Sequence, residues 1–181
     1  MATTDIAVAI YNSHEMAEAA VRALQRAGFD MRRLSIIGKN YHTEEHVVGY
    51  VNTGERLKVY GKFGAFWGGL AGMLFGSALL FVPVIGHIVV LGPVAATLAG
   101  GLEGAVLGGG ISALAGALIG IGIPKDSVLR YETAIKADKF MLIVHGTKDE
   151  IMRAHELLTA SGLASFDHHP AGAAKRPAVH A

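Results

Sequence analysis

The sequence has 181 residues, which is enough for one ordinary domain or two small ones. Its 16 Lys and Arg residues balance 15 Asp and Glu residues, and this even charge gives no support for a nucleic-acid partner, whose phosphates attract a basic surface. No cysteine is present, which excludes disulfides, thiolate chemistry and iron–sulfur clusters. Hydrophobic residues make up 51% of the chain, and this apolar content excludes intrinsic disorder.

Charged residues divide the sequence into three zones. Residues 1–62 carry 8 basic and 7 acidic side chains, and residues 124–181 carry the same numbers. The residues between them carry a single charge, Glu103, and hold 16 of the 24 glycines. We therefore expect an N-terminal half at 1–62, an apolar insert at 63–123, a C-terminal half at 124–167 and a disordered tail at 168–181.

The N-terminal zone has the pattern of a βαβ unit. The apolar run 6–11 predicts a strand, and a helix is expected over 14–27, with Asn12 and Glu15 at the spacing of a capping box. Gly28 is expected to end this helix, and the run 34–38 predicts a second strand. Two β-prone runs within 47–60, separated by turn residues, then predict a hairpin.

The C-terminal zone repeats this pattern. It predicts a helix over 125–137, a strand over 140–144 and a helix over 148–160, where Thr147 and Glu150 have capping-box spacing. Nine residues separate Met141 from Glu150, as they separate Ile6 from Glu15 in the first zone. We interpret the two zones as related halves that share one sheet, which predicts an α+β protein with ferredoxin-like βαβ halves.

The insert has the length and composition of membrane-spanning helices. A helix that crosses the hydrocarbon core needs about 20 apolar residues. Residues 63–82 provide 20 without a charge, and residues 94–123 form a second long apolar run. Because basic residues lie at both ends of the insert, the pattern favours a helical hairpin with both termini in the cytoplasm. A third crossing over 84–100 is an alternative.

Small residues recur every four positions along both predicted helices, which places them on one helix face. Such a glycine zipper lets two helix backbones approach closely, and in lipid this packing drives association. The predicted helix-packing residues are Gly64, Gly68, Gly72, Gly76, Gly100, Gly104, Gly108, Ser112, Gly116 and Gly120. The alternative interpretation buries these faces inside a water-soluble assembly.

Glu103 is the one candidate polar site within the insert. A carboxyl deep in a membrane is costly and often functional, for example as a proton or cation site or as a hydrogen-bonding group between subunits. Glu103 lies next to glycines at which the second predicted helix can bend. The alternative is therefore an interfacial carboxyl whose hydrogen bonds are satisfied.

The histidines offer only weak candidates for metal binding. His42, Glu45 and His46 match the H-x-x-E-H pattern of a class of zinc proteases, but they lie in a short polar connector. We expect no catalysis there, and at most weak metal binding by His42 and His46. His168 and His169 belong to the predicted tail and are expected to be solvated. The sequence thus predicts no catalytic residue, no resident metal and no cofactor.

Motifs in all three zones are similar to those of a known family. They are the run 7–11 with Glu15, the segments 24–29 and 34–39, the glycine-rich segment 61–69, the turn from Pro83 to Pro93, and the segment 120–128. These residues resemble the bacterial general stress protein family, whose members are induced by heat or low temperature. The resemblance covers approximately residues 5–160. It implies a non-enzymatic, membrane-associated bacterial protein of the stress response.

Together these patterns predict a stress-response protein that self-assembles through its glycine-zipper helices. Its expected partners are membrane lipid and copies of itself, and its expected location is the bacterial inner membrane. One alternative is a ligand-sensing regulatory αβ module for which the insert is only a membrane anchor. A second alternative is a soluble oligomer that buries its zipper helices and carries lipid.

Overall fold

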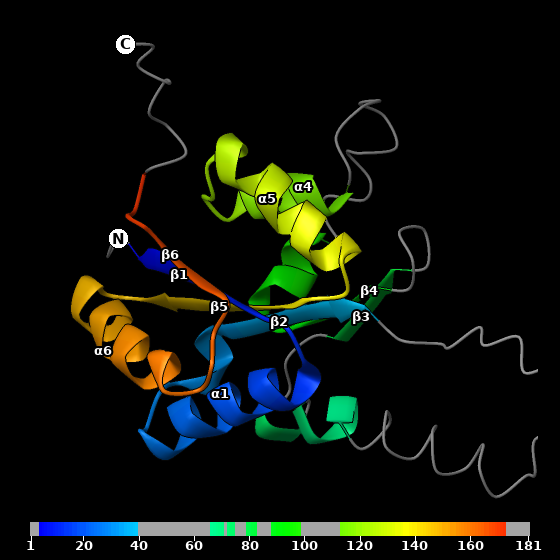
Figure 1. Ribbon diagram of the computed structural model, residues 1–181. Helices are drawn as coiled ribbons and strands as arrows, with labels where there is room; N and C mark the ends of the chain where they lie inside the picture. Colours follow the sequence, from blue (N-terminus) through cyan, green and yellow to red (C-terminus); the bar gives the residue numbers. More distant parts are fainter. Residues whose placement is uncertain are drawn as a thin grey trace, which may run out of the picture.

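An antiparallel sheet forms the middle of three layers (Figure 1). The computed structural model describes residues 4–39, 66–70, 72–74, 79–82, 88–98 and 113–172. Within these residues the sheet has six strands in the order β3-β4-β2-β5-β1-β6. Their bounds are β1 (Asp5–Tyr11), β2 (Leu34–Lys39), β3 (Leu79–Val82), β4 (Ile88–Leu91), β5 (Phe140–Gly146) and β6 (Ser165–His169). The mixed α+β class predicted from the sequence is confirmed.

Helices cover both faces of this sheet (Figure 1). The helices α1 (His14–Arg26) and α6 (Lys148–Thr159) pack on one face together with helical residues 66–70 and 72–74. The helices α4 (Ala113–Gly120) and α5 (Lys125–Lys136) pack on the other face together with helical residues 93–98. We call these the α1–α6 face and the α4–α5 face. A short 3₁₀ helix, η1 (Met31–Arg33), leads into β2.

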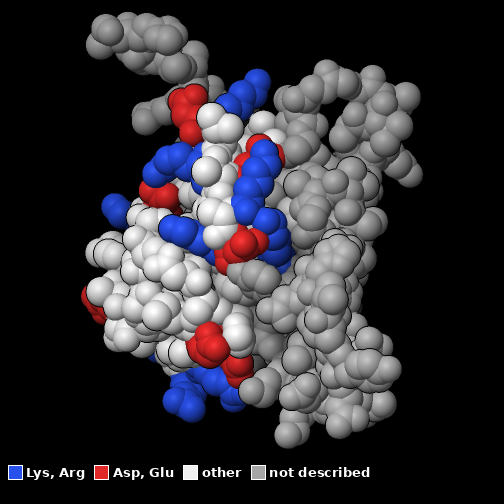
Figure 2. All heavy atoms as spheres, turned by 45° about the vertical axis from the view of Figure 1, so that its right-hand side comes forward, with Lys and Arg blue, Asp and Glu red and all other residues white. Residues whose placement is uncertain are grey.

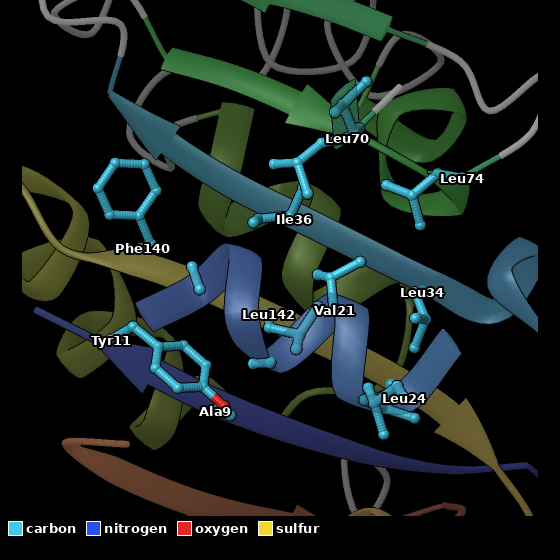
Figure 3. Packing of buried hydrophobic residues seen from close by; sticks show 14 of the residues in the cluster. Ala9, Tyr11, Val21, Leu24, Leu34, Ile36, Leu70, Leu74, Phe140 and Leu142 are labelled. Carbon is cyan, nitrogen blue, oxygen red and sulfur yellow. The ribbon is translucent and has the colours of Figure 1, made fainter. Parts of the chain in front are cut away.

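Strand alternation explains why the chain has two hydrophobic cores. Successive side chains of a strand point to opposite faces of the sheet. In β1, Ala7, Ala9 and Tyr11 belong to the core of the α1–α6 face, whereas Ile6, Val8 and Ile10 belong to the other core. Figure 3 shows the first of these cores, in which side chains of α1 meet those of β1, β2 and β5. An apolar run such as 6–11 therefore indicates a strand covered on both faces.

The two predicted βαβ patterns interleave in one sheet. β5 lies between β1 and β2, and β1 lies between β5 and β6. All of these neighbours pair in antiparallel fashion, for example with Val8 opposite Ile143 on one side and Asp167 on the other. The helices α1 and α6 consequently lie side by side on one face.

The helix ends agree closely with their sequence signals. Thr147 and Glu150 form the predicted capping box at α6, with both reciprocal hydrogen bonds present. Gly28 follows α1 with a φ of +78°, and this left-handed conformation suits glycine. The capping residue of α1 is Ser13 and not Asn12, since the Ser13 side chain accepts a hydrogen bond from the backbone of Met16. That prediction was wrong by one residue.

The apolar insert contributes strands to the sheet, which corrects the predicted helical hairpin. Residues 79–82, expected to finish the first membrane helix, form β3, and residues 88–91 in the expected turn form β4. β4 pairs with β2, with Ile36 opposite Leu91, so this hairpin extends the sheet beyond β2. The β-branched residues of 88–91 suit a strand that is buried on both faces. None of the described helices is both long enough and apolar enough to cross a membrane.

A buried hydrogen bond fastens the helical residues 93–98 to β2. Ser35 is fully buried, and its Oγ accepts a hydrogen bond of 3.2 Å from the backbone N–H of Val94. Gly92, with a φ of +99°, lets the chain pass against β2, because a Cβ there would overlap the carbonyl oxygen of Leu34. The Gly92-Pro93 pair thus starts a helix at a defined point on the sheet.

The C-terminal end of the described chain belongs to the fold. β6 extends through His169, so the predicted start of a disordered tail at residue 168 is wrong. The Asp5 carboxylate accepts hydrogen bonds from the backbone of Ala171 at 2.9 Å and from His168 Nε2 at 2.7 Å. These bonds hold the pKa of Asp5 below its ordinary value. The predicted hairpin within 47–60 lies outside the described residues.

Candidate functional site

Four of the predicted helix-packing residues lie within the described part of the chain: Gly68, Gly72, Gly116 and Gly120. The other predicted packing residues lie outside it: Gly64, Gly76, Gly100, Gly104, Gly108 and Ser112. Glu103, His42 and His46 also lie outside the described residues, so their predicted roles stay predictions. The described glycines occur in two helical segments on opposite faces of the sheet.

The segment 66–74 has an aromatic inner side and a glycine outer side. Phe66 and Trp67 are buried in the core of the α1–α6 face, and their rings contact each other at a centroid distance of 5.1 Å. The ring of Phe140 from β5 lies 5.8 Å from that of Phe66. Gly68 and Gly72 are exposed, and among the described residues no atom outside the local helix backbone lies within 4 Å of the position a Cβ would take there. The described outer side of this segment therefore presents bare backbone.

The helix α4 has a comparable arrangement on the other face of the sheet. Leu114 and Leu118 are buried in the second core, whereas Gly116 is exposed and has open space where a side chain would be. Gly120 lets α4 approach the segment 93–98, because a Cβ there would lie only 3.3 Å from the methyl group of Thr97. α4 contains no charged or hydrogen-bonding side chain. Its outer side can pack against another surface, but it offers no group for catalysis.

A buried polar cluster joins α5 to the edge strand β6. The Tyr131 hydroxyl lies 2.9 Å from Asp167 Oδ2 and 2.6 Å from His169 Nε2. Arg130 forms an ion pair of 3.5 Å with Asp167. If Tyr131 donates its single proton to Asp167, His169 donates to the Tyr131 oxygen through an Nε2–H tautomer. Every short contact is then a hydrogen bond.

Burial sets the protonation of this cluster. Desolvation raises the pKa of Tyr131, and the adjacent Asp167 raises it further. Desolvation lowers the pKa of His169, against the opposing effect of Asp167. Both groups are therefore neutral near pH 7. In this state their hydrogen bonds attach β6 to α5. His169 was expected to be solvated in the tail, and its burial corrects that prediction.

A cavity of about 370 Å³ lies where β5 ends, α6 begins and η1 leads into β2. Its polar lining comes from Arg32, Arg33, His145, Thr4 and Thr147. His145 Nε2 is buried and has no hydrogen-bond partner among the described residues. Burial lowers the pKa of this imidazole. The charged side chains that line the cavity are both basic.

Away from this cavity, basic and acidic side chains are interspersed on the described surface. Figure 2 shows Lys and Arg interspersed with Asp and Glu over the described part of one face. Ion pairs among the described residues include Arg22 with Glu18 and Lys39 with Asp138. Among the described residues, no three His, Asp or Glu side chains gather closely enough to hold a metal ion.

Sequence reasoning missed the Tyr131 cluster and the cavity for different reasons. In 165–169, Asp167 and His169 alternate with Phe166 and His168, so the spacing of residues on one strand face was visible in the sequence. The cavity gave no local signal, because Arg33 and His145 are far apart in the sequence. They meet only because β5 inserts next to β2.

The comparisons with known proteins identify part of the chain. A family model described as the heat induced stress protein YflT domain matches residues 6–80. Residues 6–80 are therefore similar to this stress protein domain. The matched segment includes β1, α1, β2 and the helical residues 66–70 and 72–73, and the match confirms the resemblance seen in the sequence. No curated protein and no solved structure matched the chain in the other two comparisons.

Proposed function

We propose that this stress-response protein is not an enzyme and acts by assembling with copies of itself through the outer sides of the segment 66–74 and α4. The family match supports the stress-response role. The proposal rests mainly on the exposed glycines, Gly68, Gly72 and Gly116, which have open space in place of a side chain. An exposed glycine in a helix costs up to about 1 kcal/mol relative to alanine, and no contact within the described chain offsets that cost.

The composition of α4 supports the same proposal independently. A helix that is apolar all round is normally covered on all sides. Only one side of α4 is covered by the second core, since Leu114 and Leu118 are buried while Gly116 is exposed. A second copy of the chain would cover the open side, and the glycines would allow its backbone to approach closely.

In this proposal the αβ core of the chain supports the segment 66–74 and α4. We infer that β1-α1-β2 and β5-α6-β6 form a ferredoxin-like core, which is consistent with the strand order β2-β5-β1-β6 and with α1 and α6 on one face. The insert then completes that core through β3 and β4 and presents its glycines outward. Association with the bacterial inner membrane, with both termini in the cytoplasm, is the second part of the proposal. There the assembled apolar faces would contact lipid.

Sedimentation velocity on the full chain without detergent tests the self-assembly. Wild-type protein is expected to sediment as an oligomer. Gly68→Leu with Gly72→Leu, and separately Gly116→Leu, are expected to shift it toward the monomer, because the new side chains fill the approach surface and no described atom outside the local helix backbone lies within 4 Å of the new Cβ atoms. Gln25→Leu, which adds the same side chain at an exposed position of α1, is the control and should leave the oligomer unchanged.

A monomeric wild-type protein would overturn the proposal, as would an oligomer that tolerates all three glycine substitutions. Cell fractionation with a carbonate wash tests the membrane part separately. Retention in the washed membranes supports it. Recovery as a soluble oligomer restricts the function to assembly in water and overturns the membrane part.

A further inference from the structure

We propose that the cavity between η1, β5 and α6 binds the phosphate group of a small molecule. The inference goes beyond the proposed function, because the cavity is formed by residues other than the exposed glycines. Its volume of about 370 Å³ lies in the range of pockets that hold small molecules, which is roughly 300–1,000 Å³. A lone ion would leave most of this space unfilled, so a phosphate ester with a short carbon chain suits the cavity better.

The lining favours an anion because its charged members are Arg32 and Arg33. Both arginines are held in place by carboxylates that do not line the cavity. Arg32 donates from Nε and Nη2 to Asp30 at 3.0 Å each, and Arg33 donates from Nη1 to the two oxygens of Glu150 at 3.2 and 3.1 Å. A guanidinium group has five N–H donors, so each arginine keeps donors beyond those its carboxylate accepts.

The fixed arginines lower the entropic cost of binding. A bidentate pair between a guanidinium group and a carboxylate holds the side chain in one geometry. Asp30 and Glu150 reduce the net charge near the cavity, so the site depends on directed hydrogen bonds more than on long-range attraction. Such a site selects by geometry and should remain selective at moderate ionic strength.

The neutral members of the lining favour phosphate over carboxylate. His145 lines the cavity with other atoms of its residue, because its Nε2 is buried away from the accessible space. The Thr147 hydroxyl accepts a hydrogen bond from the backbone of Glu150, so its own proton is available to a ligand. Two guanidinium groups and a hydroxyl offer donors from three side chains, whereas a carboxylate presents only two oxygens. Three phosphate oxygens can accept from all of them.

Calorimetric titration of the full chain with inorganic phosphate and with glycerol 3-phosphate, at matched ionic strength, tests the site. Binding is expected for wild-type protein, and Arg32→Gln with Arg33→Gln should weaken it at least about tenfold. Arg22→Gln is the matched control, because Arg22 also pairs with a carboxylate, Glu18, on the surface of α1. It should bind as wild type does. Arg32→Gln alone keeps the bond between Arg33 and Glu150 and serves if the double variant does not fold.

Imidazole NMR spectra give a second measurement on the unaltered protein. Phosphate should shift the ring signals of His145 and leave those of His155, which stacks on Phe166 away from the cavity lining, unchanged. Equal shifts in both histidines, or equal affinities in the double variant and the Arg22→Gln control, would overturn the proposal. So would the absence of binding in wild-type protein to every phosphate probe.

Vesicles distinguish a free phosphate ester from a lipid headgroup. Phosphatidylcholine vesicles with added phosphatidic acid present the same phosphate chemistry at a lipid surface. If these vesicles bind wild-type protein but not the Arg32→Gln and Arg33→Gln double variant, while glycerol 3-phosphate does not bind, the site takes the headgroup. Sedimentation of the same variants reports self-assembly separately, so a failure of the phosphate site is distinguishable from a failure of the proposed function.

Discussion

Tyr131 illustrates how one hydroxyl group can hold two elements together. Its ring belongs to the hydrophobic core of the α4–α5 face, and its oxygen lies between Asp167 and His169 on the edge strand. A buried polar group that loses its partner bears the full cost of desolvation, about 1–3 kcal/mol. Asp167 and His169 of β6 therefore rely for a hydrogen bond on Tyr131, which lies more than thirty positions earlier in the chain.

Tyr131→Phe is expected to destabilise the fold by about 1–3 kcal/mol, because the ring stays while Asp167 and His169 lose their common partner. Tyr11→Phe is the matched control. Tyr11 is equally buried, but Ser161, which contacts its hydroxyl, also donates to the carbonyl of Leu158 and keeps that bond. Urea unfolding should show the larger loss for Tyr131→Phe, and equal losses would contradict the proton arrangement described for the cluster.

At the scale of elements, the start of the helical residues 93–98 depends on a close approach between two segments. Gly92 passes β2 so closely that a Cβ would lie 2.7 Å from both the Cα and the Oγ of Ser35. Ser35 Oγ in turn accepts the hydrogen bond from Val94 that starts the helix. Gly92, Ser35 and β2 therefore act as one unit that orients the helical residues 93–98.

Gly92→Ala is expected to destabilise the protein more than Gly28→Ala. Both glycines have positive φ, so each alanine bears a conformational cost of about 1–2 kcal/mol. Only the Gly92 substitution meets other atoms, and this overpacking adds about 1–3 kcal/mol. Thermal or urea unfolding of the two variants measures the difference. A similar loss in both would mean that the approach of Gly92 to β2 is looser than described.

At the scale of the whole molecule, the buried His169 and the half-buried His145 lie in one row across the sheet. Ile6 of β1 stands opposite His145 of β5 and opposite His169 of β6. Directly opposed residues project from the same face of a sheet, so both imidazoles lie on the α4–α5 face. Burial lowers both pKa values below the ordinary 6.5, and global unfolding exposes both rings together.

The stability of the fold should therefore decrease as the pH falls below about 6.5. In that range the unfolded chain binds protons at both histidines while the folded chain does not, so acid favours unfolding. The free energy of unfolding cannot change by more than about 1.4 kcal/mol per pH unit for each histidine. Urea unfolding at pH 7.5 and 5.5 measures it, with His145→Gln and His169→Gln as variants. If both variants keep the full wild-type slope, other groups control the acid sensitivity.

The local elements of the two αβ zones could be predicted from the sequence because their signals are short-range. The strand at β1 follows from an apolar run, and α6 follows from the pairing of Thr147 with Glu150 three residues later. Gly28 ends α1 because a left-handed residue is needed there. Each of these signals depends on neighbours in the chain and needs no distant partner.

The path of the insert and the position of the cavity were decided by the tertiary structure. The strand 88–91 is buried on both faces of the sheet, and its apolar composition is the same as that of a segment buried in lipid, so its composition gave no sign of which applied. Residues 88–91 form a strand because β2 offers backbone groups with which β4 can pair. The same sheet brings Arg33 next to Glu150 and opens the cavity beside His145, contacts that only the order of the strands creates.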